Sequence, residues 1–187
     1  LNNCESNYNI AIGSDAHFNL TTGDMGDNIA IAHNAQNSLT TGSGTANQPN
    51  ISIGNRSLYD CTTGSENTAI GHFSLNNLTD GTNNIAIGNY SGNLTTTGDK
   101  NICIGINAVC GANQQNSILI GTSTDSSQAP SALDDNTVVL GNTDTLKWLP
   151  ADDNGVDLGS SDYSFKDGFF QRSIYFGYLR PMGSTYD

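Results

Sequence analysis

The chain has 187 residues, of which 35% are hydrophobic and only 13% charged, and its formal net charge is −12. Such an acidic chain repels the phosphates of nucleic acids and of anionic membrane surfaces, so we expect neither as a partner. Gly, Asn, Thr and Ser replace the missing charged residues, and all four are weak helix formers. The composition therefore predicts an all-β protein of short strands and tight turns.

Targeting segments and membrane spans are not expected from the sequence. The apolar runs are only a few residues long, which is too short for a transmembrane helix. Leu1 is neither an initiator methionine nor the start of a signal-peptide pattern, so we expect a processed chain or a segment of a longer one.

A repeat of seventeen residues dominates the chain. The two glycines of this repeat keep their positions from copy to copy. The two earliest copies have extra residues, and these fall only after the second glycine, Gly23 or Gly42. Insertions at one corner of a coil would have this distribution. Two looser copies, SILIG at 117–121 and TVVLG at 137–141, bring the expected number of rungs to about eight. The six clearer copies begin at Asn9, Asn28, Asn50, Asn67, Asn84 and Asn101.

The repeat predicts a parallel β-helix or β-roll solenoid over residues 1–141. If the Asn is position zero, positions one and three are mostly isoleucine, whereas position two is a small residue. Alternation along a strand places these two sets on opposite faces. We expect the isoleucines to fill the coil and the small residues to face a partner chain. These candidate interface residues are Ala11, Ala30, Ser52, Ala69, Ala86 and Cys103.

Two further positions carry a physical expectation. Position four is glycine in all of the six clear copies but one, where Ala32 stands, and glycine permits a sharp turn there. The Asn at position zero predicts a ladder of side-chain hydrogen bonds along the coil, because a buried amide without partners is costly.

A small-residue face implies self-association about an axis parallel to the coil, because a thin rod buries little apolar surface by itself. We expect a homotrimer. The residues alone leave a two-fold assembly open, and also a monomeric solenoid whose small-residue face meets water.

The rungs NTAIGHFSLNNLTDGTN and NIAIGNYSGNLTTTGDK resemble the NTAIG-type repeat of phage and other viral fibre proteins. More loosely, they are similar to the NSVAIG repeat of trimeric autotransporter heads. The resemblance covers roughly residues 9–121 and departs from the pattern at Ala32. It implies a trimeric left-handed β-roll on the virion surface or in the extracellular space, with the small residues facing the three-fold axis. The partners that it implies are other fibre or tail proteins and a host glycan or protein receptor.

Residues 142–187 differ in composition, since they are rich in aromatic side chains. The segment GVDLGSSDYSFKDGFFQRSIYFG at 155–177 resembles an element that precedes the tip or the chaperone of marine phage tail fibres. We predict a boundary near Gly141 and a β-rich aromatic cap or neck beyond it. An alternative role for its aromatic residues is receptor contact, for which the candidates are Tyr175, Phe176 and Tyr178.

Catalytic and metal-binding chemistry is not expected. A glycosidase needs two carboxylates at a set separation, and acids are sparse along the repeats, so a tailspike-like enzyme is a remote alternative. The acidic pairs Asp134–Asp135 and Asp152–Asp153 favour turns over a calcium site. His33 and His72 share position five but lie two rungs apart, and we expect them to be exposed. No cofactor is predicted.

The four cysteines are Cys4, Cys61, Cys103 and Cys110, and their spacing fits no zinc motif. Cys61 and Cys110 are three rungs apart, beyond disulfide reach. Copies of Cys103 are able to meet at a trimer axis, but buried free thiols are the favoured state. The repeat predicts the coil and its self-association, and the resemblance implies a structural virion fibre, on a phage tail or head. The alternative is a cellular trimeric surface adhesin or an extracellular filament, and an enzyme is not expected.

Overall fold

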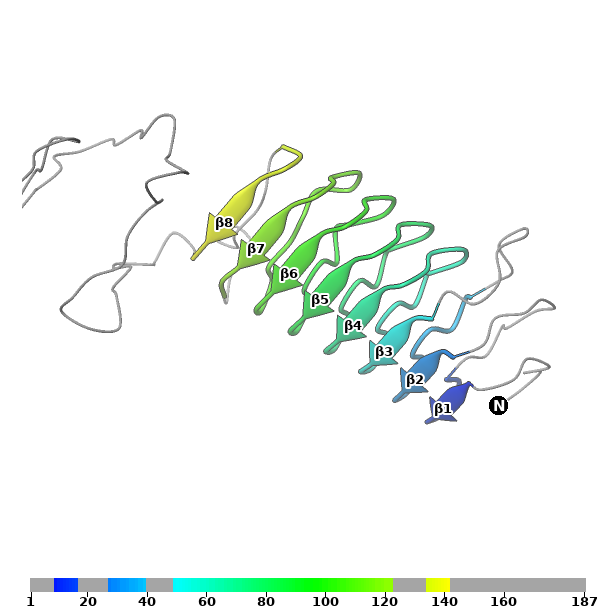
Figure 1. Ribbon diagram of the computed structural model, residues 1–187. Coiled ribbons are helices and arrows are strands. Elements are labelled where there is room, and N and C mark those ends of the chain that lie inside the picture. The colour runs from blue at the N-terminus through cyan, green and yellow to red at the C-terminus, as the bar shows by residue number, and fades with distance from the viewer. Residues whose placement is uncertain (1–8, 17–26, 40–48, 123–133, 142–187) are drawn as a thin grey trace, which may run out of the picture. The chain divides into compact units, whose positions relative to one another are not determined.

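The computed structural model describes residues 9–16, 27–39, 49–122 and 134–141. Eight three-residue strands stack in chain order into one parallel sheet, and the coil completes about six turns (Figure 1). The structure thus confirms an all-β parallel solenoid, with about six turns where about eight rungs were predicted. The strands are β1 (Ile10–Ile12), β2 (Ile29–Ile31), β3 (Ile51–Ile53), β4 (Thr68–Ile70), β5 (Ile85–Ile87), β6 (Ile102–Ile104), β7 (Ile118–Ile120) and β8 (Val138–Leu140).

The register of the sheet follows the sequence repeat. Each strand residue pairs with the residue at the same position of the next copy, so that Ala69 lies beside Ala86 and Ala86 beside Cys103. The same register joins β7 to β8, whose copies are the loosest in sequence. One chain position therefore forms one column along the coil, and any property that repeats at that position becomes a continuous stripe.

The glycine at position four is required by the corner that follows each strand. Gly71 has a φ of 134°, which disfavours any side chain. A Cβ atom on Gly71 would also overlap the backbone carbonyl oxygen of Gly88 in the next rung. Ala32, the exception in the repeat, has a φ of 109° and so adopts the same unfavourable region of backbone space.

Left-handed backbone conformations also recur at positions where glycine is mostly absent, among them positions six and eight. Position six has φ near 55° in three successive rungs, at Arg56, Phe73 and Tyr90. Position eight does the same at Leu58 and Leu75, with φ of 49° and 46°. Each such residue costs about 1–2 kcal/mol relative to an ordinary turn conformation, so the stacking of rungs must stabilise it.

The prediction of which strand face is interior was wrong. The position-two residues Ala30, Ser52, Ala69, Ala86 and Cys103 are at most 1% exposed within a single chain, and Ala11 in β1 is half-buried. They point into the coil and are not available to a partner. The isoleucines at positions one and three point outward instead, and several are exposed.

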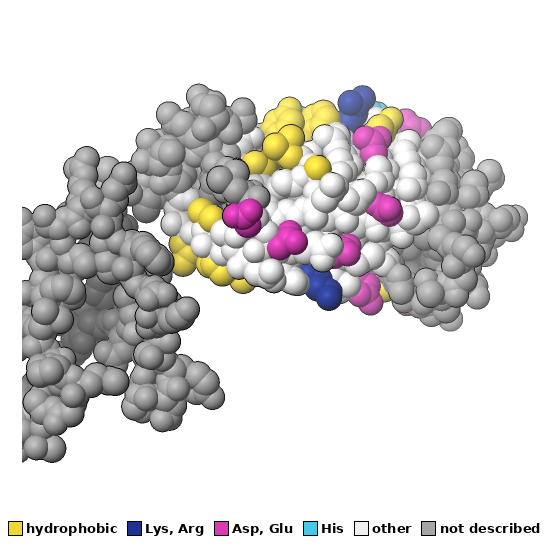
Figure 2. Space-filling view, turned by 90° about the horizontal axis from the view of Figure 1, so that it is seen from above, with side chains coloured by type: hydrophobic (Ala, Val, Ile, Leu, Met, Phe, Trp, Pro, Cys, Tyr) yellow, Lys and Arg dark blue, Asp and Glu magenta, His cyan; other side chains and the backbone are white. Residues whose placement is uncertain are grey.

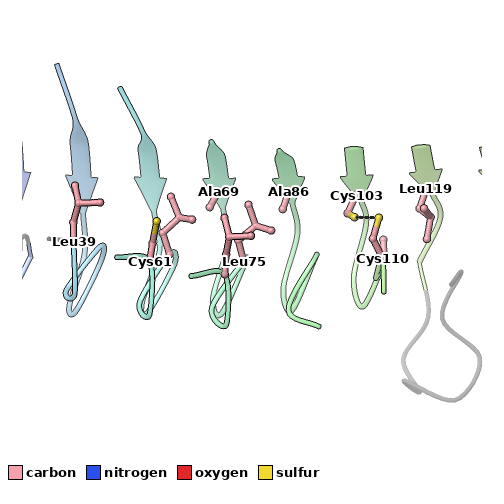
Figure 3. Packing of buried hydrophobic residues seen from close by; sticks show 11 residues of the cluster. Leu39, Cys61, Ala69, Leu75, Ala86, Cys103, Cys110 and Leu119 are labelled. Carbon is pink, nitrogen blue, oxygen red and sulfur yellow. Dashed lines mark hydrogen bonds between the residues drawn. The ribbon is translucent and has the colours of Figure 1, made fainter. Parts of the chain in front are cut away.

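The physical reason for this orientation lies on the opposite wall of the coil. Leu58 and Leu75 at position eight and Leu78 at position eleven are fully buried and fill the interior. Ala69 and Ala86 belong to the same packed cluster, shown in Figure 3 with Leu39 and Leu75. Because these leucines occupy the space, only a small residue fits at position two of their own rungs, whereas β7 has the buried Leu119 at that position.

The predicted asparagine ladder is confirmed, with a backbone partner at each step. The Asn67 side-chain oxygen accepts the backbone N–H of Asn84 at 2.9 Å, and its amide group donates to the carbonyl of Gly81 at 2.9 Å. The same pair of bonds recurs for Asn50 and Asn84. These amides are 1% exposed or less, so the ladder satisfies polar groups that burial would otherwise leave costly.

Several predictions fall beyond the residues that the structure describes. The chain divides into a unit at Leu1–Leu146 and a second at Lys147–Asp187. No residue of the second unit is among those described, so the aromatic cap stays a prediction, together with Tyr175, Phe176 and Tyr178. The same holds for Cys4 and for the acidic pair Asp152–Asp153, and trimerisation likewise stays a prediction.

Candidate interaction surface

The outward face of the sheet is a stripe of branched aliphatic side chains. Each of the eight strands contributes two outward positions, and of these sixteen residues all but Thr68 are Ile, Val or Leu. Exposure is greatest near the two ends of the sheet, where Ile12 is 59% and Val138 63% exposed. In the middle of the sheet Ile85 and Ile87 are also exposed. We call the sixteen outward strand residues the aliphatic stripe.

Such a stripe is unusual for a surface that meets water. A contiguous apolar patch on a soluble protein typically marks an interaction site. No charged residue occupies any of the sixteen positions, so the face has no electrostatic preference of its own. Its apolar side chains repeat at the strand spacing of about 4.8 Å. A partner surface whose apolar side chains have the same spacing would therefore pack against it best.

The face of the coil drawn in Figure 2 is largely polar. Figure 2 shows mostly uncharged polar surface with scattered acidic groups, and hydrophobic side chains gathered in a few places. The hydroxyl and amide groups of this surface bond mainly to backbone carbonyls of the neighbouring rung, as Thr62 and Thr79 do. The aliphatic stripe differs from this polar surface, because fifteen of its sixteen side chains are apolar.

A column of aromatic and cationic side chains lies at a second corner. The rings of Phe73 and Tyr90, both at position six, stack at 5.1 Å with an angle of 4° between their planes. Arg56, one rung earlier, lies over the Phe73 ring at 5.6 Å and over Tyr59 at 5.1 Å. Contacts of this kind are worth about 0.5–1.5 kcal/mol each. Sequence reasoning missed this column, although Arg, Phe and Tyr at one repeat position were its signal.

Two of the three histidines lie in a neighbouring column at position five. His33 and His72 are exposed, as expected, and each contacts an asparagine of an adjacent rung: Asn55 at 3.1 Å and Asn89 at 3.3 Å. His33 also lies 3.9 Å from a carboxylate oxygen of Asp15. Among the described residues, no three His, Cys, Asp or Glu side chains are grouped as metal ligands would be.

The acidic pair Asp134–Asp135 belongs to a turn, as the sequence favoured. The Asp135 carboxylate accepts the backbone N–H of Gln115 at 2.8 Å, and the Asp134 carbonyl accepts the Thr137 hydroxyl at 2.8 Å. The first bond connects the turn before β8 to the preceding rung, and the second closes the turn itself. The two aspartates therefore stabilise the turn before β8.

The cysteines that the structure describes are all buried, as expected. Burial raises the pKa of the Cys61 thiol to about 12, and the nearby Asp80 carboxylate adds to the rise. Cys103 and Cys110 face each other across one rung, with 2.8 Å between their sulfur atoms. This pair was not predicted from the sequence, in which Cys110 was considered as a partner for Cys61 alone.

Comparison with known proteins adds no relative: the chain matches no family model, no curated protein and no solved structure. Within the described residues, no helix has the length and hydropathy needed to cross a membrane. The protein is thus a repeat protein whose turns of about seventeen residues build a parallel β-solenoid.

Proposed function

We propose that this chain is a structural, non-enzymatic segment of a trimeric fibre on a virion surface, on a phage tail or head. It acts as a rigid shaft that presents or contains a surface for a host receptor. The observation that carries this proposal is the aliphatic stripe: the interior is packed within one chain, whereas fifteen of the sixteen outward strand residues are apolar.

Self-association follows from the stripe by the hydrophobic effect. Burying apolar surface contributes about 25 cal/mol for each Å² removed from water, and the stripe runs the length of the sheet. Because every rung has the same outward residues, copies related by rotation about an axis parallel to the coil bring like rungs together. This corrects the predicted interface: the isoleucines, and not the small residues at position two, form it.

The resemblance of the repeats to viral fibre proteins supports three copies and the virion location. The looser resemblance to trimeric autotransporter heads supports the second candidate, a cellular surface adhesin or extracellular filament, which would use the same coil. In both, the partners are further copies of the chain, neighbouring fibre or surface proteins, and a glycan or protein receptor.

Light scattering of the full chain tests the assembly. We expect a mass near three times 19.7 kDa. Replacing Ile85 and Ile87 together by Thr should yield a folded monomer, because both side chains lie outside the packed interior. Leu94→Thr is the matched control, since Leu94 is 56% exposed but lies away from the stripe. A monomeric parent chain, or a double variant that still forms trimers, would contradict the proposed interface.

Antibody labelling distinguishes the two locations. An antibody against the purified chain should decorate fibres on purified virions in electron micrographs. Labelling of host cell surfaces in uninfected cultures would instead favour the adhesin.

A further inference from the structure

Cys103 and Cys110 form a pair of facing thiols inside one rung. Their Sγ atoms are 2.8 Å apart, and each residue is 1% exposed (Figure 3). That separation is about 0.8 Å longer than a disulfide bond of ~2.05 Å. Cys61, by contrast, contacts the backbone carbonyl of Gly64 at 3.6 Å.

The local sequence brings the pair together. Cys103 occupies position two of β6, the inward position that is Ala or Ser in the five preceding strands. Cys110 occupies position nine, which in the rungs that begin at Asn50 and Asn67 holds the partly exposed Tyr59 and Asn76. The rung that begins at Asn101 has sixteen residues before Ser117, one fewer than each of the three rungs before it. In this shorter rung Cys110 is buried and faces the strand.

We propose that Cys103 and Cys110 form a disulfide that closes this rung. Formation is a two-step exchange with a small-molecule disulfide such as oxidised glutathione. One cysteine thiolate attacks the glutathione disulfide and releases one glutathione thiol, which leaves a mixed disulfide. The second cysteine then attacks the mixed disulfide and releases the second glutathione thiol. The two cysteines lose two protons and two electrons, and the glutathione disulfide gains them.

Burial determines when the bond forms and how long it lasts. The thiolate is the reacting species. The pKa of the Cys110 thiol is raised chiefly by the hydrogen bond with Cys103 and also by burial. The folded pair is therefore a poor nucleophile, so exchange takes place while the rung is open. Once the rung has closed, the disulfide is shielded from reductants. The bond lies within one chain and does not depend on the proposed function.

Peptide mapping tests the proposal on the full chain. The protein is refolded with reduced and oxidised glutathione, alkylated in denaturant and digested with trypsin. The peptide 101–147 holds Cys103 and Cys110 and no other cysteine. We expect it two hydrogens lighter than the reduced peptide and without alkyl groups, while the Cys61 peptide is alkylated. Two alkyl groups on peptide 101–147, or Cys103 joined to a second chain, would overturn the proposal.

A kinetic readout separates a buried disulfide from an accidental one. Dithiothreitol should reduce the bond at least tenfold more slowly in the native protein than in denaturant, and equal rates would contradict the proposal. Reduction should also lower the melting temperature by several degrees in the parent chain and in Cys61→Ser, but not in Cys103→Ser. If Cys103→Ser does not fold, Cys110→Ala gives the same comparison.

Discussion

The inward and outward faces of the eight strands differ in what one chain supplies to them. Inward, Ala69 and Ala86 are covered by leucines, and the Ser52 hydroxyl bonds to Ser57. Outward, the aliphatic stripe is partly exposed, and none of the residues that the structure describes covers it. The interior is therefore complete in a monomer, whereas the outer face is not. Changes inside should affect folding, and changes outside should affect assembly.

The largest effect is expected where the interior is polar. Asn67→Ala removes the acceptor for the Asn84 backbone N–H and the donor to the Gly81 carbonyl. Each buried group left without a partner costs about 1–3 kcal/mol, so we expect the free energy of unfolding to fall by about 3–5 kcal/mol. Urea denaturation measures this change. Asn89→Ala, an exposed control, should change it by less than about 0.5 kcal/mol, and similar losses for both variants would sink the argument.

A smaller loss should follow from added volume at position two. Ala86 is fully buried, and a Cβ atom built on Gly92 would already approach the Ala86 Cβ to 3.3 Å. Ala86→Leu therefore overpacks the coil, at a cost of about 1–3 kcal/mol. Thr68→Leu is the matched control, because it adds an apolar side chain on the outward face of the adjacent strand. Denaturation of both variants should show a loss for Ala86→Leu alone, and the reverse result would restore the original assignment of the faces.

The coil and its register could be predicted from the sequence, because the glycines and the insertions occur at the same positions in successive copies of the repeat. The Asn ladder and the glycine corner at position four could be predicted from the same constant positions. Which face is interior could not be predicted from strand alternation, since alternation separates the two sets without saying which one points inward. The deciding residues were Leu58, Leu75 and Leu78, far along the rung, whose volume leaves room for only Ala or Ser at position two of the same rungs.

The Cys103–Cys110 pair and the aromatic column were missed for a related reason. Both depend on how the corner after position five turns, and that corner uses left-handed conformations at residues such as Phe73 and Tyr90. No propensity favours such residues there. The position of a residue in the repeat therefore predicts which residues of successive rungs stack on one another. It does not predict the direction in which a side chain at the corner points.

The third effect depends on pH and isolates one interior side chain. The Cys61 thiol has an ordinary pKa of about 8.5 in an unfolded chain, and burial raises that pKa to about 12 in the fold. Above pH 8.5 the unfolded state loses this proton first, so the free energy of unfolding falls by about 1.4 kcal/mol per pH unit until about pH 12.

The measurement compares urea denaturation of the parent chain and of Cys61→Ala from pH 8 to 11. The difference between the two chains cancels the titration of all other groups. We expect the parent to lose stability more steeply with rising pH than the variant. Parallel pH profiles would show that Cys61 is not buried as the interior requires.

The smallest effect concerns an interior hydroxyl that lacks a partner. Among the described residues, the buried Thr95 hydroxyl at position eleven makes no hydrogen bond. Thr95→Val keeps the shape and removes a polar group that burial penalises, so we expect the free energy of unfolding to stay equal or to rise by up to about 1 kcal/mol. Ser52→Ala is the contrast, because the Ser52 hydroxyl bonds to the Ser57 carbonyl at 2.9 Å and its loss should cost about 1 kcal/mol. If Thr95→Val instead lost as much stability as Ser52→Ala, the Thr95 hydroxyl would have a partner in the folded protein, and the inward face would be satisfied at that position as well.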